Sequence, residues 1–252
     1  MPAPTYHVIG NYLSPYVRKV LVCLRLKGLD YSIDPIAPFV GNAEFERLSP
    51  LRRIPVLIHG DRVINDSTVI CQYLEDLHPA PSLYPQDPGE RAQARWLEEY
   101  ADTRLGEVIV WGMFFQRGLK RILFKEDTDQ ARYEHARDVA LPACLDWLEP
   151  QVPAQGYLFG DQLSIADISV ASFFRNAAFV RVQVDAARWP RTAAWLDRVL
   201  ALPAFVALAR IEDTIARVPL HEQRPLLASL GEPLSETTVG GASPRRGVMR
   251  LD

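Results

Sequence analysis

The sequence predicts an α/β domain followed by an all-helical domain. Its first third carries a strand-helix-strand unit, with strands over 6–9 and 31–36 and a helix that begins at Ser14. Residues 53–75 then have the pattern of a β-hairpin that leads directly into a helix. After the proline-rich run 78–88, the apolar residues recur at helical spacing nearly throughout. Strands that alternate with helices indicate a mixed sheet, and the later segments indicate a helical bundle.

The first predicted helix has clear boundaries. Ser14 is its N-cap, Pro15 takes the first helical position, and Gly28 ends it. Its buried face follows the helical period and comprises Val17, Val20, Leu21 and Leu24. The basic residues fall mostly outside that stripe: Arg18, Lys19, Arg25 and Lys27. Because a parallel strand follows the helix, the crossover should be right-handed.

A hairpin is predicted to begin at Pro55. Proline cannot donate a ladder hydrogen bond, so a strand starts there, and the Ile54–Pro55 bond is a candidate cis peptide. Gly60-Asp61 fits a two-residue turn of type II′. The second strand leads to Asp66-Ser67, both good N-cap types for the helix that follows. Because a helix start binds carboxylates, this region suits a small peptide ligand with a free carboxylate.

Five further helices are predicted beyond the proline-rich run, and a third, short helix is predicted before it, between the second strand and the hairpin. The short helix spans 42–48, and the others span Arg91 to about Gln116, Gln130 to about Leu148, Ile165 to about Val180, Pro190 to Leu200, and Ala204 to Val218. Ser164 and Asp167 form a variant of the capping box at the start of the third long helix, with Asp in place of the usual Glu or Gln. We therefore interpret Asp167 as a structural residue.

These elements divide the chain into four parts. The α/β domain spans 1–80, a linker spans 81–88, and the helical domain spans 89–218. The remaining residues, 219–252, gain Gly, Pro, Ser and charge, and we expect an extended or disordered tail there.

Composition excludes several classes of function. The 252 residues are 48% hydrophobic and 23% charged with a net charge of −3, so no basic footprint for nucleic acid is present. No apolar run approaches the roughly 20 residues of a membrane span, and the N-terminus lacks the pattern of a signal peptide. We therefore expect a cytoplasmic protein without membrane contact. Cys23, Cys71 and Cys144 lack the spacing of a metal site, so we expect reduced thiols and no metal.

Four features in order carry a resemblance to a known family. They are Ser14-Pro15-Tyr16-Val17-Arg18-Lys19, Arg53-Ile54-Pro55-Val56, Asp66-Ser67, and Tyr157-Leu158-Phe159-Gly160-Asp161 followed by Ser164-Ile165-Ala166-Asp167. At this spacing the chain resembles the cytosolic glutathione S-transferase superfamily over residues 6–215. The resemblance implies a thioredoxin-like N-terminal domain with a mixed four-stranded sheet, an all-α C-terminal domain, glutathione as co-substrate and a homodimer.

The resemblance implies that Ser14 is the catalytic residue. Members with serine at this position, such as the theta-, zeta- and tau-like classes, use its hydroxyl to stabilise the glutathione thiolate. Related glutaredoxins carry Cys-Pro-Tyr-Cys there, whereas this chain has Ser14-Pro15-Tyr16-Val17. Because dithiol exchange requires a thiolate at the helix start, the sequence argues against a reductase of that type.

The resemblance also implies how glutathione would be held. Ile54, beside a cis Pro55, would offer its backbone N–H and C=O to the cysteinyl part of the peptide. Ser67 would bind the γ-glutamyl carboxylate and Asp66 the γ-glutamyl ammonium, while Arg53 would approach the glycyl carboxylate. The family usually shows Glu where this chain has Asp66, and the shorter side chain reaches less far.

Other residues near these positions offer alternative readings. Tyr12 is a rival hydroxyl, because other classes use a tyrosine just after the first strand, and Asn11 is a third polar group there. In the family, the region of Trp111, Phe114 and Phe115 faces the apolar electrophile. Ordinary core packing is the competing interpretation for these aromatic residues.

The implied reaction is conjugation of the glutathione thiolate to small apolar electrophiles. A binding or scaffold module with little catalysis is an alternative, as is a glutathione-dependent peroxidase or isomerase. Zeta-like isomerases carry Ser-Ser-Cys at the active-site turn, and Leu13-Ser14-Pro15 departs from that pattern. Retention of Ser14, Ile54-Pro55 and Ser67 favours an enzyme.

Overall fold

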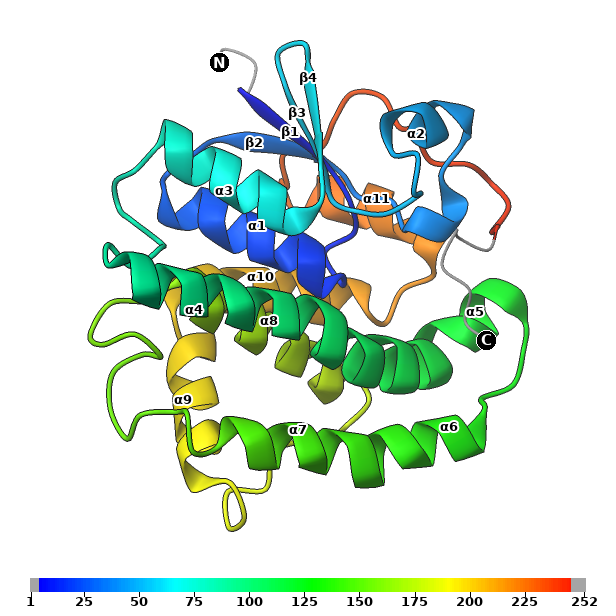
Figure 1. Ribbon diagram of the computed structural model, residues 1–252. Helices are drawn as coiled ribbons and strands as arrows, with labels where there is room; N and C mark the ends of the chain where they lie inside the picture. Colours follow the sequence, from blue (N-terminus) through cyan, green and yellow to red (C-terminus); the bar gives the residue numbers. More distant parts are fainter. Residues whose placement is uncertain (1–4, 246–252) are drawn as a thin grey trace. The chain divides into compact units, whose positions relative to one another are not determined.

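The computed structural model describes residues 5–245 and divides the chain into two compact units (Figure 1). The first, called here the sheet unit, comprises the chain up to Pro81 together with the residues from Val206 onward. The second, the helical unit, spans Ser82–Phe205. The sheet unit is thus discontinuous in sequence, which the sequence did not predict.

The sheet unit contains a four-stranded mixed sheet, as predicted. Its strands are β1 (Tyr6–Ile9), β2 (Tyr31–Asp34), β3 (Val56–His59) and β4 (Arg62–Asn65), in the order β2-β1-β3-β4. β1 pairs parallel with β2 and antiparallel with β3, and β3 pairs antiparallel with β4. β2 ends one residue before Pro35 and is therefore two residues shorter than predicted, because proline cannot donate to the ladder.

The hairpin has the predicted geometry. His59 pairs with Arg62, so the turn contains two residues, and Gly60 has a φ of 58° whereas Asp61 has no positive φ. This pattern fits the type II′ turn predicted from the sequence. The Ile54–Pro55 bond is cis, which confirms that prediction.

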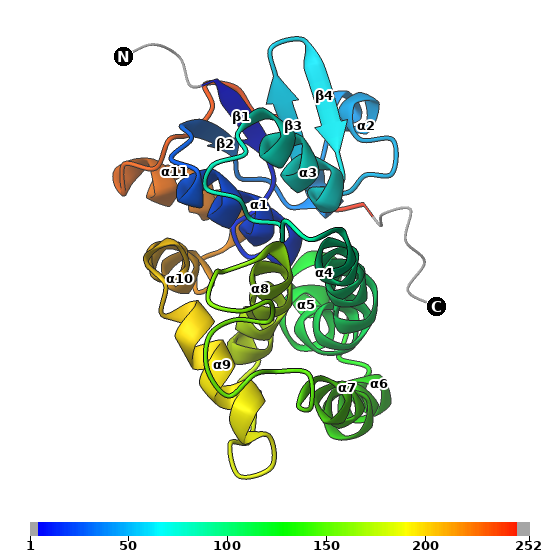
Figure 2. The same cartoon turned by 60° about the vertical axis from the view of Figure 1, so that its left-hand side comes forward.

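Four helical segments accompany the sheet in the first part of the chain. They are α1 (Pro15–Leu26), η1 (Pro38–Val40), α2 (Ala43–Leu48) and α3 (Ser67–Leu77). Figures 1 and 2 show α1 and α3 side by side against the sheet, and the two helices are in contact. One residue separates α3 from β4, and a five-residue loop joins β1 to α1, so the sheet sets where both helix N-termini lie.

Two basic residues of α1 are buried, against the interpretation that they lie off its buried face. Arg18 is 1% exposed and Lys19 is fully buried. Arg18 Nε lies 2.5 Å from Glu212 Oε1, a carboxylate that is also buried, on α10 (Pro203–Ile215). A buried charge requires a partner, and α10 supplies this one from nearly 200 residues away. The periodicity of α1 alone could not reveal that partner.

The prediction of an extended or disordered tail over 219–252 is wrong for the part that the structure describes. The chain forms α11 (Leu220–Ser229) and then returns along the sheet. Val239 is buried in a core cluster with Ile9, Ile36, Phe45 and Val56. The glycines, prolines and serines of this segment suggested a disordered tail, but its apolar residue Val239 enters the core. Residues 246–252 lie outside the described part of the chain.

The helical unit follows the predicted helices closely. One continuous rod comprises α4 (Pro88–Tyr100), η2 (Ala101–Leu119), which is wound as a π-helix, and α5 (Lys120–Phe124). A second comprises α6 (Gln130–His135), η3 (Ala136–Ala140) and α7 (Leu141–Leu148), and the unit also contains α8 (Ile165–Phe179) and α9 (Pro190–Leu200). α8 packs against α4 and η2, and Figure 2 shows α8 beside α4. Most residues of α8 are buried, as predicted.

The capping box at the start of α8 is formed. The Asp167 carboxylate accepts from the Ser164 backbone N–H at 2.9 Å and from the Ser164 hydroxyl at 2.7 Å. Its other oxygen accepts from the Leu158 N–H and from the Trp195 indole N–H, each at 2.9 Å. Asp167 is fully buried, so these four donors replace the water that its carboxylate loses. Its predicted structural role is therefore confirmed.

Across residues 5–245, no single helix is long and apolar enough to cross a membrane, although α9 and α10 pass the same test together as a bent pair.

Candidate functional site

Ser14 occupies the turn between β1 and α1. It is the N-cap of α1 with extended backbone (φ −80°, ψ 127°), and its Oγ accepts a long 3.4 Å hydrogen bond from the Val17 N–H. The side chain is half-buried, and its hydroxyl donates to no residue within 5–245. The helix start contributes partial positive charge at the same place. Ser14 therefore offers an unused hydroxyl donor beside the positive end of a helix, a combination that stabilises an anion.

The two alternatives to Ser14 are committed to internal contacts. The Tyr12 side chain is fully buried, and its hydroxyl donates to Glu232 Oε2 at 2.8 Å. Burial, more than any neighbouring charge, raises the pKa of Tyr12, so the phenol stays protonated. The Asn11 amide donates to Gln223 and to the Pro35 carbonyl, and its oxygen accepts from the Leu13 N–H. The geometry therefore disfavours both residues as partners of a ligand.

Ile54 presents an unpaired peptide group at the start of the hairpin. Within residues 5–245, neither its backbone N–H nor its C=O makes a hydrogen bond. The preceding turn is fixed, because Ser49 Oγ donates to the Arg53 carbonyl at 2.8 Å and accepts from the Arg53 N–H at 3.0 Å. A fixed and unpaired donor and acceptor on one residue can bind an extended peptide in the manner of a further strand.

Asp66 is held in a strained conformation at the start of α3. Its φ of 77° and ψ of 131° lie in a region that favours glycine, at a cost of order 1–3 kcal/mol. Its Oδ1 caps the helix by accepting from the Thr68 and Val69 N–H groups at 2.9 and 3.3 Å, and the side chain remains exposed. Ser67 follows as the first residue of α3 and is 3% exposed. Because strain of this kind clusters at functional sites, Asp66 is a candidate binding residue.

Charged groups lie near these positions. The Arg53 side chain is exposed, and its guanidinium has no acidic partner within residues 5–245. The buried Lys19 ammonium donates to Thr68 Oγ1 at 3.1 Å and so places positive charge beside the first turn of α3. Helical periodicity alone could not reveal this contact of Lys19 with Thr68.

The aromatic residues predicted to face an electrophile lie on η2. Phe114 and Phe115 are buried, and Trp111 is partly exposed. Phe115 packs against Trp111 and Phe124 with ring centroids 5.6 and 6.2 Å apart. These contacts are those of an aromatic core, and a role toward an electrophile stays a prediction.

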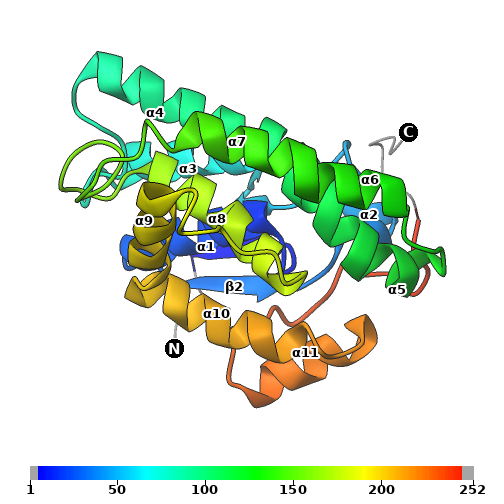
Figure 3. The ribbon, with the colours of Figure 1, turned by 90° about the horizontal axis from the view of Figure 1, so that it is seen from below.

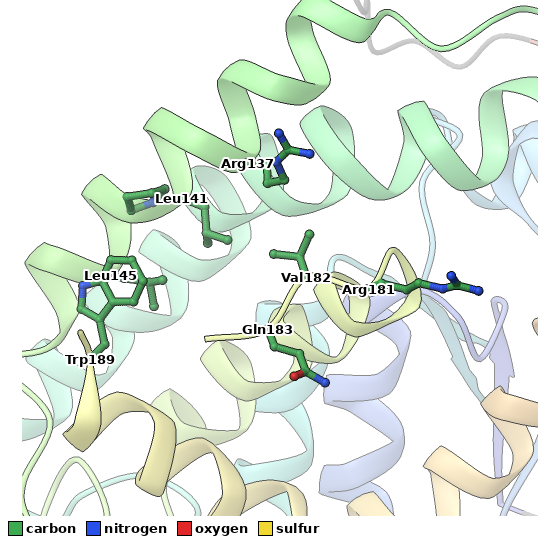
Figure 4. Close-up of a pocket in the computed structure, with 8 residues that line it drawn as sticks. Arg137, Leu141, Leu145, Arg181, Val182, Gln183 and Trp189 are labelled. Atoms are coloured by element: carbon green, nitrogen blue, oxygen red, sulfur yellow. The ribbon is translucent and has the colours of Figure 1, made fainter. Parts of the chain in front are cut away.

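The helical unit also contains a cavity of about 280 Å³ that none of the predicted site residues lines (Figure 4). Its lining comprises Arg137, Leu141, Pro142, Leu145, Arg181, Val182, Gln183 and Trp189. Asp138 binds the Arg137 guanidinium in a bidentate pair, and Asp146 accepts from the Trp189 indole N–H. Both polar groups are thus satisfied internally. Residues 5–245 contain no group of three or more His, Cys, Asp or Glu that could hold a metal ion.

Two domains of one known family match this chain. Residues 8–82 match the glutathione S-transferase N-terminal domain, and residues 130–198 match the glutathione S-transferase C-terminal domain. The first match covers Ser14, Ile54-Pro55 and Asp66-Ser67.

Individual relatives support the same assignment. Maleylacetoacetate isomerase of Rattus norvegicus is 30% identical over 194 residues, which cover 74% of this chain and 84% of that protein. The crystal structure of beta-etherase LigF from Sphingobium sp. strain SYK-6 has a TM-score of 0.69 and 25% identity, and covers 82% of this chain and 99% of that one. A theta class glutathione S-transferase from Xanthomonas axonopodis pv. citri, solved with glutathione bound, has a TM-score of 0.68 and 26% identity over 82% of this chain and 97% of that one. The chain therefore belongs to the cytosolic glutathione S-transferase superfamily and is an enzyme of that superfamily.

Proposed function

We propose that this protein conjugates the glutathione thiolate to small apolar electrophiles, with Ser14 as the catalytic residue. The observation that carries the proposal is the Ser14 hydroxyl at the N-terminus of α1, which donates to no acceptor in the part of the chain that the structure describes. The hydroxyl would donate to the glutathione sulfur. The sulfur loses its proton to solvent and uses a lone pair to bond to an electrophilic carbon, which expels a leaving group or passes its electrons to an acceptor.

The energy required is modest. A free thiol has a pKa of about 8.5 and is mostly protonated at neutral pH. Each unit of pKa lowering needs about 1.4 kcal/mol, and a hydrogen bond to a charged acceptor contributes about 1.5–3 kcal/mol. One hydroxyl together with the helix start can therefore bring the thiol pKa to neutral pH or below.

The remaining residues would hold the peptide. The unpaired backbone of Ile54 suits the cysteinyl part, beside the cis Pro55. Ser67, at the start of α3, suits the γ-glutamyl carboxylate, and the exposed carboxylate of Asp66 suits the ammonium. The exposed Arg53 suits the glycyl carboxylate. The electrophile would lie against the apolar region of Trp111, Phe114 and Phe115 on η2.

Relatives suggest two other uses of the same thiolate. A relative named as an isomerase is 30% identical to this chain, and thiolate addition followed by elimination isomerises a double bond. A structural neighbour is named as a beta-etherase, and thiolate attack at the carbon of an ether expels its oxygen as the leaving group. Both are second candidates that retain Ser14 as the catalytic residue. Leu13-Ser14-Pro15 argues against the isomerase, because zeta-like isomerases carry Ser-Ser-Cys there.

We also propose a cytoplasmic homodimer, as is usual in the superfamily. Exposed aromatic residues support an interface on the helical unit, since Trp96 is 57% exposed and Trp147 is 37% exposed. Tyr100 lies between them, with ring centroids 6.5 Å from Trp96 and 4.2 Å from Trp147. Light scattering after size-exclusion chromatography would give twice the chain mass, and a monomer at micromolar concentration would contradict this proposal.

The function is tested by titrating the ultraviolet absorbance of the glutathione thiolate in complex with the purified protein. We expect a thiol pKa below that of free glutathione and turnover of a generic aryl halide. The same assay should include an organic hydroperoxide, maleylacetoacetate and an activated ether. Activity with one of these three alone would assign the peroxidase, isomerase or etherase reaction instead. Binding without turnover on the whole panel would favour a binding module, and absence of binding would refute the proposal.

A further inference from the structure

The segment 219–241, called here the C-terminal strap, completes the sheet unit. After α11 it adds to the outer edge of β2, where the Ile33 N–H donates to the Pro233 carbonyl at 2.8 Å and the Ser235 N–H donates to the Ile33 carbonyl at 3.0 Å. Figures 1 and 3 show α11 and the following red segment beside the sheet and α1. The strap therefore covers the edge of the strand that neighbours β1.

Gln223 of the strap contacts the loop that carries Ser14. Its Oε1 accepts from Asn11 Nδ2 at 3.0 Å, and both side chains are about 5% exposed or less. Its Nε2 donates to the Ile215 and Val218 carbonyls at 3.1 and 3.2 Å. Because both carbonyls need the amide nitrogen, the oxygen of Gln223 must face Asn11. The Gln223 amide therefore has a single orientation, and the flipped one, with its nitrogen toward Asn11, is excluded.

Glu232 makes a second contact with the same loop. Glu232 Oε2 accepts a hydrogen bond from the Tyr12 hydroxyl, and Arg25 Nη2 lies 4.0 Å from the same oxygen. Tyr31, whose hydroxyl accepts from Arg25 Nε at 3.2 Å, completes this group. Two consecutive residues of the loop, Asn11 and Tyr12, are therefore both anchored to the strap.

These anchors reach Ser14 through the backbone. The Asn11 carbonyl accepts from the Ser14 N–H at 3.0 Å, and the Asn11 side-chain oxygen accepts from the Leu13 N–H at 3.0 Å. Asn11 thus holds both residues of the Leu13–Ser14 peptide, Leu13 through its side-chain oxygen and Ser14 through its backbone carbonyl. Among the described residues, the Ser14 hydroxyl makes a single long contact, to the Val17 N–H.

We propose that the C-terminal strap is a positioning element for Ser14, with Gln223 acting through Asn11 and Glu232 acting through Tyr12. The inference rests on the proposed role of Ser14 as the donor to the glutathione sulfur. A functional group must be held to within about 0.5 Å of its productive position by neighbours whose own orientation is fixed. Here two buried or partly buried polar contacts from the far end of the chain provide that support.

Gln223→Leu tests the first anchor. It removes the acceptor of Asn11 and should let the loop relax, so that the Ser14 hydroxyl meets the sulfur less well. We expect the thiol pKa of bound glutathione to rise by about one unit. At a pH below the thiol pKa, this lowers the thiolate fraction, and with it kcat/KM, roughly tenfold. The KM for glutathione should change less than twofold, because Ile54 and Ser67 lie on other turns. A merely stabilising role would leave the thiol pKa unchanged.

Arg224→Met is the matched control. Arg224 is the next residue of α11, but it binds Asp34 at 2.8 Å and the Ser235 carbonyl rather than the Ser14 loop. The variant should lower the melting temperature without shifting the thiol pKa. Glu232→Ala and Glu232→Gln provide a second pair should Gln223→Leu fail to fold. The alanine variant should raise the thiol pKa, and the glutamine variant, which keeps an acceptor for Tyr12, should restore it.

The outcomes separate this inference from the proposed function. A wild-type protein that does not lower the thiol pKa of bound glutathione removes the premise and with it the inference. A wild-type protein that lowers it, together with unshifted values in Gln223→Leu and Glu232→Ala, refutes the strap as a positioning element alone. An equal shift in Arg224→Met would also refute it, because loss of stability would then explain every variant.

Discussion

Within residues 5–245, two serines are helix N-caps, and they differ in what their hydroxyls do. Ser164 begins α8, is 3% exposed, and donates its hydroxyl to the buried Asp167. Ser14 begins α1 and is half-buried, and its hydroxyl donates to no residue within 5–245. α1 has no acidic residue in its first turn, so no capping box can form there.

The difference separates a structural cap from one available to a ligand. At Ser164 every polar atom has a partner inside the helical unit, so the site has nothing to offer a ligand. At Ser14 the helix begins with Pro15 and a long hydroxyl contact, and no acceptor within the described part of the chain takes the hydroxyl proton. The same residue type thus contributes mainly to stability at one position and to proposed chemistry at the other.

Asp167→Asn should have the largest effect and should act on stability. The amide nitrogen would replace an oxygen that accepts from Ser164, so that two donors face each other in a buried site. We expect a loss of about 3 kcal/mol in the free energy of unfolding. Urea denaturation measures it, and activity per folded molecule should remain. A loss below about 1 kcal/mol would show that the capping box is not a major structural contact.

Ser14→Ala should reverse that pattern. Loss of a hydrogen bond to a charged sulfur should lower kcat/KM with an aryl halide about 100-fold, while stability changes by less than about 1 kcal/mol. Steady-state kinetics and thermal unfolding measure the two effects. Ser164→Ala serves as its control, because it should lower stability and leave kcat/KM intact. Unchanged activity in Ser14→Ala would contradict the proposed catalytic role of Ser14.

Ser67→Ala adds a third helix-start serine to the comparison. The native Ser67 is the first residue of α3, after the Asp66 cap, and its contact with glutathione would be equally strong in the ground state and in the transition state. We expect the KM for glutathione to rise about tenfold with little change in kcat. Isothermal titration calorimetry should show the same loss of affinity. A normal affinity would mean that the α3 start does not hold the γ-glutamyl end.

Asp66→Gly should have the smallest effect on stability. Glycine adopts a positive φ without strain and replaces a helix cap at a cost of a few tenths of a kcal/mol, so the net change should be stabilising by up to about 1 kcal/mol. Glutathione affinity should nevertheless fall, because the carboxylate proposed to bind the ammonium is lost. Asp66→Ala, which keeps the strain and loses the cap, should be less stable than both. A stabilised variant with unchanged affinity would assign Asp66 to capping alone.

Local sequence signals predicted much of this fold. Ser14-Pro15, Pro55, Gly60-Asp61 and the Ser164 cap each act within a few residues of their own position, so their effects could be read directly. The four-stranded sheet and the helical rods followed from the spacing of apolar residues. The candidate site could be predicted in part for the same reason, since Ser14, Ile54 and Ser67 each lie at an element boundary.

The remaining features depend on contacts between distant parts of the chain. The buried Arg18 requires Glu212, and the buried Asp34 requires Arg224 and the Val239 N–H. The Tyr12 hydroxyl was an alternative to that of Ser14 because its acceptor, Glu232, lies 220 residues later in the chain. The sequence around Tyr12 gives no sign of that contact. No local pattern encodes such pairs. Three of the partners, Arg224, Glu232 and Val239, lie in a segment whose Gly, Pro and Ser content predicted disorder.

The order in which the two units become complete during synthesis follows from the discontinuity of the sheet unit. The last residue of the helical unit is Phe205, so that unit can fold while the strap is still inside the ribosome. Synthesis of the sheet unit begins first, but its core residue Val239 is made only after the whole helical unit. Since domains generally fold as units during translation, the first domain to be started should be the last to be finished. Nascent chains that end before residue 239 should therefore carry a folded helical unit and a protease-sensitive sheet unit.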